Sequence, residues 1–101
     1  MDRPLVLEDF ADKVGDRFAI AVDDRPAGAV AATLTEAEPL FPGRAPAGSR
    51  PPFSLVFVAD HAPMLAQRIY RIEHAALGAM SIFLVPIGRD ARGFSYQATF
   101  N

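Results

Sequence analysis

The chain contains no cysteine, although half of its 101 residues belong to the hydrophobic class. Without cysteine, neither a disulfide framework nor a zinc site with thiolate ligands can form. This absence is compatible with a reducing cytoplasm. A chain of this length buries about 65% of the surface that it exposes when unfolded, which suffices for a core without such cross-links. We therefore predict a single globular domain over residues 1–101.

The chain also lacks an apolar run long enough to cross a membrane as a helix, which requires about 20 residues. Its first ten residues, MDRPLVLEDF, contain three acids and a proline, whereas a signal peptide has basic residues followed by a longer apolar stretch. We expect a soluble protein with no signal peptide and no membrane partner. Its expected location is the cytoplasm or an assembled particle.

Net charge is small and unevenly distributed. Ten basic and twelve acidic residues give a formal charge of −2. Residues 1–50 hold nine acids and six bases, net −3, whereas residues 51–101 hold three acids and four bases, net +1. This balance lacks the basic surface typical of nucleic-acid binders, so we predict no nucleic-acid partner.

Several segments alternate apolar and polar residues, a pattern typical of strands with one buried face. We predict strands over residues 17–22, 29–36, 53–59, 65–74, 79–87 and 94–100. The run 80–87 differs, because every residue except Ser81 is apolar or proline. That pattern predicts a strand covered on both faces.

A short helix is predicted over residues 8–14, ahead of the first strand. Leu7, Phe10 and Val14 fall at i, i+3 and i+7, on one side of a helix, and Gly15 follows where a left-handed cap residue is favoured. Two turns are too short to be stable alone. The helix is therefore expected to cover the open end of a barrel or sandwich.

Residues 38–52 contain five prolines and two glycines and are predicted to form a long loop. Loops of this length in a compact domain are usually functional or disordered. The other connections are mostly of hairpin length, which favours antiparallel strands. The predicted fold is mainly β, with about six antiparallel strands in a small barrel or sandwich and one short N-terminal helix. We favour a barrel-like meander, because closure hides strand edges.

Two acid–histidine pairs, Asp60-His61 and Glu73-His74, are candidates for metal binding or acid–base chemistry. Neighbours on a strand point to opposite faces, so Glu73 and His74 do not converge on one ion. We predict instead that His74 hydrogen-bonds to the adjacent turn or to a nearby side chain, and that His61 lies in a loop. No serine has a nucleophile context and no glycine-rich phosphate loop is present. We predict no catalytic residue, metal or cofactor.

Arginine supplies nine of the ten basic residues, and exposed arginine is enriched at protein interfaces. Arginines near the ends of the predicted strands would form a basic patch for an acidic partner; the alternative is that they only maintain solubility. The candidate interaction residues are Arg44, Arg50, Arg68, Arg71, His74, Arg89 and Arg92.

Several motifs together resemble a family of uncharacterised small bacterial domains. They are PFSLVF (52–57), YRIEH (70–74) followed by Leu77-Gly78, IFLVPIG (82–88) and YQATFN (96–101), with LEDF (7–10) and VGDRF (14–18) near the N-terminus. The likeness covers nearly the whole chain, and the proline-rich loop fits it least. Some members lie near collar proteins of phage-tail-like assemblies, so the resemblance implies an accessory or assembly role.

The leading hypothesis is a non-enzymatic structural or protein-interaction module of a bacterial protein, accessory to a phage-tail-like assembly. It would meet another protein, or a second copy, through exposed strand edges or the loop 38–52. The alternative is a β-barrel that carries a small ligand beside His74, with the loop 38–52 as a flap. An enzyme ranks third, because it would need His61, His74 and a carboxylate to converge in a cleft.

Overall fold

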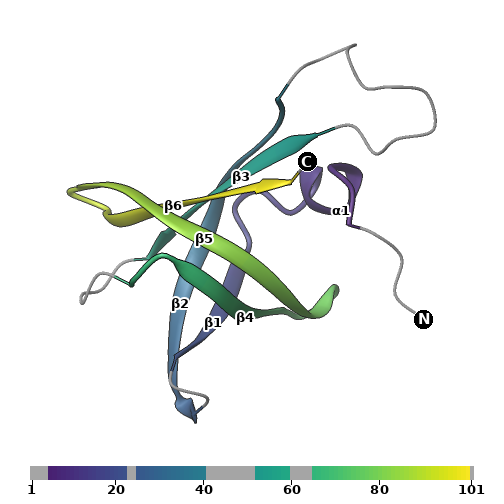
Figure 1. Cartoon of the computed structure of the whole chain (residues 1–101). Helices are drawn as coiled ribbons and strands as arrows, with labels where there is room; N and C mark the ends of the chain where they lie inside the picture. Colours follow the sequence, from purple (N-terminus) through teal and green to yellow (C-terminus); the bar gives the residue numbers. More distant parts are fainter. Residues whose placement is uncertain (1–4, 23–24, 41–51, 60–64, 101) are drawn as a thin grey trace.

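Six antiparallel strands close into a small barrel in a computed structural model that describes residues 5–22, 25–40, 52–59 and 65–100 (Figure 1). A short helix, α1 (Glu8–Ala11), precedes them. The strands are β1 (Arg17–Val22), β2 (Arg25–Pro39), β3 (Phe53–Ala59), β4 (Arg68–His74), β5 (Gly78–Asp90) and β6 (Gly93–Phe100). The predicted mainly β class is confirmed, and the structure is a barrel rather than a sandwich.

The strand order around the barrel is β1-β2-β3-β6-β5-β4, so the predicted simple meander is wrong. β3 pairs with β6 instead of with β4, and β4 returns to pair with β1. Eight residues separate β3 from β4, more than a tight hairpin uses, which allows the chain to reach a strand that is not adjacent. The barrel therefore consists of two three-stranded meanders, β1-β2-β3 and β4-β5-β6.

The seam between β1 and β4 is the shortest in the barrel. Its register contains the pairs Ala19↔Glu73 and Ile20↔Ile72, whereas every other seam is longer. This seam nevertheless closes the sheet. Closure thus removes most of the exposed strand edges through which we expected the protein to meet a partner.

Four of the predicted strands have different bounds in the structure. β2 spans Arg25–Pro39 instead of 29–36, β4 begins at Arg68 rather than at residue 65, β5 spans Gly78–Asp90 instead of 79–87, and β6 begins at Gly93 rather than at residue 94. The long β5 accommodates its proline because the register shifts between Pro86 and Gly88. The proline-rich loop consequently starts later than residue 38, and most of it, residues 41–51, lies outside the described residues.

The helix is one turn, ending at Ala11, and the predicted packing of Val14 is wrong because its side chain is 47% exposed. Residues 12–15 form a turn instead, and Gly15 adopts a left-handed φ of 97°. Its N–H donates to the carbonyl of Leu34 at 2.7 Å, which directs the chain onto β2. In the part of the chain that is described, no helix is long and apolar enough to span a membrane.

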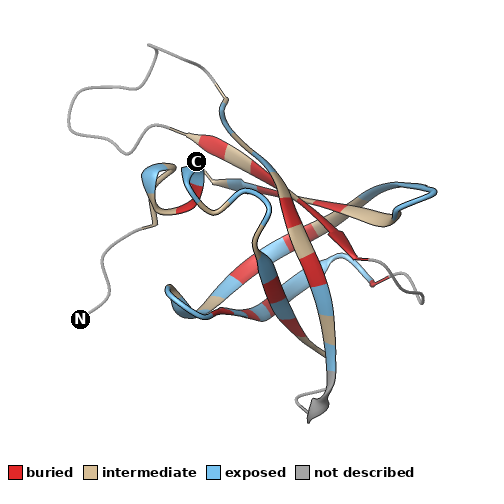
Figure 2. Ribbon diagram, turned by 180° about the vertical axis from the view of Figure 1, so that it is seen from behind, coloured by how far each residue is buried: buried red, intermediate tan, exposed pale blue. Residues whose placement is uncertain are grey.

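Side chains alternate between the barrel interior and its surface, as the bands of Figure 2 show. The prediction that β5 is covered on both faces is wrong. Its inward residues Ile82 and Leu84 are buried, but the outward Phe83 is 46% exposed and Ile87 is 51% exposed. A closed barrel buries only the inner face of each strand, so an apolar residue that points outward stays at the surface.

Phe10 places α1 against one end of the barrel, as predicted for a covering helix. Its ring is fully buried and lies 6.0 Å from the ring of Phe53 and 6.2 Å from that of Phe100. Phe53 and Phe100 stack on each other with centroids 4.5 Å apart. Three aromatic rings therefore close this end, where β3 begins and β6 ends (Figure 1).

Two tyrosine hydroxyls hold the segment before β4 at the opposite end of the barrel. The buried Tyr96 hydroxyl accepts a hydrogen bond from the backbone N–H of Leu65 at 2.8 Å. The Tyr70 hydroxyl donates to the carbonyl of Ala66 at 2.6 Å. Both bonds connect side chains of the core to the chain that enters β4.

The Tyr96 hydroxyl should contribute measurably to stability. We expect Tyr96→Phe to lower the free energy of unfolding by about 1–3 kcal/mol, because the buried Leu65 N–H loses its acceptor. Urea unfolding followed by circular dichroism measures the change. Tyr70→Phe is the matched control: its hydroxyl is a donor in a part-buried bond, and water can replace it. A larger effect for Tyr70→Phe would contradict this account.

Candidate functional site

Two of the candidate arginines cover aromatic rings at the end of the barrel where β4 begins. The Arg68 guanidinium lies 5.3 Å from the centroid of the Tyr70 ring, and that of Arg89 lies 5.8 Å from the centroid of the Phe94 ring. Contacts of this kind combine cation–π attraction with packing of the aliphatic stem. Arg68 and Arg89 thus have a structural role in shielding the barrel end.

The other two candidate arginines in the described residues, Arg71 and Arg92, form exposed ion pairs within their own strand or turn. Arg71 Nε lies 3.3 Å from Glu73 Oε2, and Arg92 Nη2 lies 3.1 Å from Asp90 Oδ2. The hydrogen bond from Arg92 holds the pKa of the Asp90 carboxyl below its usual range. Exposed pairs such as these add little to stability. Arg44 and Arg50 lie outside the described residues.

His74 connects the β4–β5 turn to the chain that enters β1. Its Nδ1 accepts hydrogen bonds from the backbone N–H groups of Ala76 and Leu77, at 3.0 and 3.2 Å. Its Nε2 lies 2.8 Å from Oδ2 of Asp16. The imidazole bonds both to the turn and to a nearby side chain, as predicted, and it reinforces the short β1–β4 seam from the end of β4.

These contacts define the tautomer of His74. A backbone N–H can only donate, so Nδ1 must be an unprotonated acceptor. Nε2 then carries the proton, and this N–H donates a hydrogen bond to the Asp16 carboxylate. The side chain of His74 is 6% exposed, and its ring packs 4.6 Å from the ring of Phe18. Both ring nitrogens are therefore occupied, and the imidazole offers no free base for catalysis.

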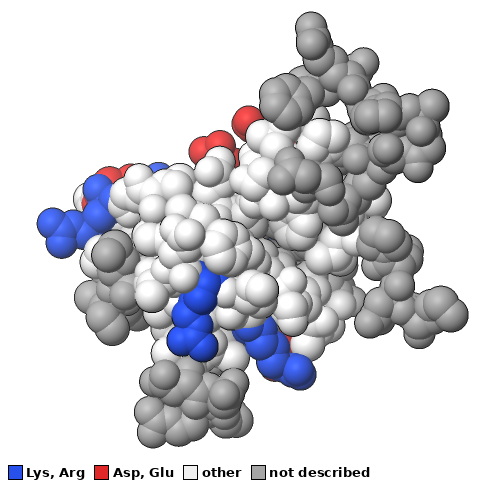
Figure 3. Space-filling view, viewed as in Figure 1, with Lys and Arg blue, Asp and Glu red and all other residues white. Residues whose placement is uncertain are grey.

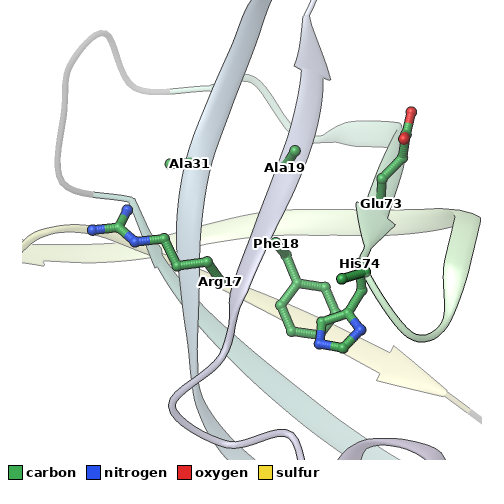
Figure 4. Close-up of a pocket in the computed structure, with 7 residues that line it drawn as sticks. Arg17, Phe18, Ala19, Ala31, Glu73 and His74 are labelled. Carbon is green, nitrogen blue, oxygen red and sulfur yellow. The ribbon is translucent and has the colours of Figure 1, made fainter.

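An open cavity of about 370 Å³ lies beside this histidine on the outside of β1 and β2. Alanines contribute much of its lining, and Arg17, Glu73 and His74 supply the longer polar side chains (Figure 4). Because the His74 nitrogens already have partners, the cavity lacks the convergent unpaired polar groups that orient a small ligand. We assign no ligand to it.

Glu73 and His74 point to opposite faces of β4, as predicted (Figure 4). Glu73 is exposed and His74 is buried, so they cannot bind one ion together. Across residues 5–22, 25–40, 52–59 and 65–100, no three histidine, aspartate or glutamate side chains are grouped as a metal site would require. Asp60 and His61 lie outside these ranges.

The most unusual surface is the outer face of β4 and β5, which we call the β4–β5 face. It consists of Ile69, Arg71 and Glu73 on β4 and of Ala79, Ser81 and Phe83 on β5, with Ile87 farther along β5. Ile69 and Phe83 are directly opposed across the two strands and are 63% and 46% exposed. Among the described residues, these two, Ile87 and Val14 are the large apolar side chains left exposed.

The signal for this face in the sequence is the apolar run 80–87. This run predicted a strand buried on both sides, whereas the barrel covers only one. The pattern therefore predicted burial for Phe83 and Ile87, but these side chains point outward and the barrel does not bury them. The two-residue period of a strand puts Ile69 on the face of β4 opposite to Tyr70 and Ile72, but its pairing with Phe83 depends on the strand register.

Comparison with known proteins identifies the family but no activity. No curated protein and no solved structure shows significant similarity to the chain. One family model, described as Domain of unknown function (DUF6916), matches residues 5–100, which is nearly the entire sequence and includes all six strands. The chain therefore belongs to the DUF6916 family.

Proposed function

We propose that this protein is a non-enzymatic structural or protein-interaction module, accessory to a phage-tail-like bacterial assembly, and that it docks through the β4–β5 face. The observation that carries the proposal is the exposed cross-strand pair of Ile69 and Phe83. Contiguous exposed apolar surface is characteristic of interaction sites. The link to a tail-like assembly is supported by the resemblance of its sequence motifs to domains found near collar proteins.

The charge distribution is consistent with a docking surface. Viewed as in Figure 3, the surface over β5 is largely without charged side chains, and basic side chains lie at its margins, over β4 and at the β5–β6 hairpin. An uncharged centre with a polar rim is the usual arrangement of a protein interface. Arginine is one of the residues enriched at such interfaces.

No observation favours the alternative of a ligand-carrying barrel. The interior positions of the described strands are filled by large side chains, including the fully buried Phe18, Phe57 and Tyr96. Its flap, the loop 38–52, lies mostly outside the described residues. The interaction module therefore stands as the single proposal.

Photo-crosslinking in the producing cells tests the docking face. A photoreactive amino acid at position 83 should form adducts with a defined partner, which mass spectrometry identifies as a component of a tail-like particle or as a second copy. The matched control is the same amino acid at Thr99, exposed on the outer face of β6. Identical adducts from both positions, or none from position 83, would overturn the proposal.

A further inference from the structure

We infer that the β4–β5 face binds a second copy of this chain in a twofold dimer, an inference that rests on the proposed interaction function. In this dimer, Ile69 of each copy packs against Phe83 of the other. The composition of β5 favours a second copy. Its residues 80–87 have the pattern of a strand covered on both sides, and the barrel supplies only the inner cover. A second barrel would supply the outer one.

The charge of the β4–β5 face also favours a second copy. Arg71 and Glu73 are the charged residues of the β4–β5 face, and they cancel. A strongly acidic or strongly basic partner would therefore gain little from this face. A second copy presents the same neutral surface, with no net repulsion to overcome.

The strand register determines which twofold arrangement fits. Ile69 lies opposite Phe83, Arg71 opposite Ser81, and Glu73 opposite Ala79. If the twofold axis runs between β4 and β5 and parallel to them, β4 of one copy lies over β5 of the other. Each Ile69 then meets Phe83, each Arg71 meets a serine hydroxyl that can accept its hydrogen bond, and each Glu73 meets only a small alanine.

The competing arrangement is less favourable. If β4 lay over β4 with the axis parallel to the strands, Arg71 would face Arg71 and Glu73 would face Glu73. Like charges directly opposed disfavour association. The geometry therefore points to contact of β4 with β5 across the interface, an isologous contact that closes at two copies.

Light scattering on purified protein tests the inference. The wild-type chain should have twice its own mass of 10.9 kDa, falling toward that of the monomer on dilution. Ile69→Lys and Phe83→Glu should each be monomeric, because each places a charge against an apolar residue of the second copy. Mixed in equal amounts, the two variants should recover the dimer mass, since Lys in one copy meets Glu in the other. Added salt should weaken this mixed dimer.

Thr99→Lys and Thr99→Glu on the outer face of β6 are the matched controls and should stay dimeric alone and when mixed. Circular dichroism verifies that every variant is folded. If Ile69→Lys or Phe83→Glu does not fold, a crosslinking experiment with variants that keep both Ile69 and Phe83 replaces this test. The chain has no native cysteine, so Arg71→Cys mixed with Ser81→Cys should be joined by a short bismaleimide more efficiently than either is joined to itself.

The outcomes separate the two proposals. A wild-type chain that is monomeric at every concentration, or a dimer that persists in both charged variants, would overturn the second copy as occupant. If position 83 still captures another protein in cells, the proposed interaction function survives that result. If position 83 captures nothing specific, both proposals fail.

Discussion

Replacing Phe10 by alanine is expected to lower the free energy of unfolding by about 3–5 kcal/mol, the usual cost of removing a fully buried phenylalanine ring. Phe10 is 0% exposed and contacts both Phe53 and Phe100. The short α1 cannot be stable alone, so its position depends on packing against the core, to which Phe10 contributes a fully buried ring beside the partly buried Leu5 and Leu7. Chemical denaturation gives the change in free energy.

Val14→Ala is the matched control for Phe10→Ala. Val14 lies in the turn just after α1 and its side chain is 47% exposed, so its truncation should change stability by no more than about 0.5 kcal/mol. Hydrogen exchange should also show faster exchange at the first residues of β3 in the Phe10 variant. Equal effects of the two substitutions would mean that α1 does not cover the barrel end.

Local patterns predicted most of the interior correctly. Alternation puts Phe18 and Ile20 on one face of β1 and Tyr96 and Ala98 on one face of β6, and all four are buried. These assignments depend only on the two-residue period of a strand, which the sequence displays directly. The class of the fold followed from the number of such segments and from their short connections.

The arrangement of the strands could not be predicted in the same way. The pairing of β3 with β6, and of β4 with β1, depends on competition among many non-local contacts and not on any single segment. The same limit applies to the candidate site. Ile69 and Phe83 become a paired apolar surface only through the β4–β5 register, and the partner of His74, Asp16, is 58 positions away in the chain.

Burial also depends on how many layers cover a strand, which is a property of the whole molecule. The run 80–87 satisfies the pattern of a strand with two covered faces, but the closed barrel has a single layer. The sequence and the isolated barrel agree on the inner face, where Ile82 and Leu84 are buried. They differ only on the outer face, where a second copy on the β4–β5 face would cover Phe83.

The hydrogen bonds of His74 should contribute measurably to stability. His74→Ala is expected to lower the free energy of unfolding by about 1–3 kcal/mol, because the turn loses its acceptor and Asp16 loses its donor. Two other substitutions separate these roles. The Oδ1 of Asn can replace Nδ1 as acceptor for the turn, and the Nε2 of Gln can replace the imidazole Nε2 as donor to Asp16.

A double-mutant cycle with Asp16→Ala measures the bond across the β1–β4 seam. Asp16→Ala should be destabilising in the wild-type and His74→Gln backgrounds, which keep a donor for the carboxylate. It should have little effect in His74→Asn, where that donor is already absent. Because β1 and β4 share few register pairs, we also expect faster hydrogen exchange at Ala19 and Ile20 whenever this bond is removed. An equal cost of Asp16→Ala in all three backgrounds would show that the bond does not help to close the barrel.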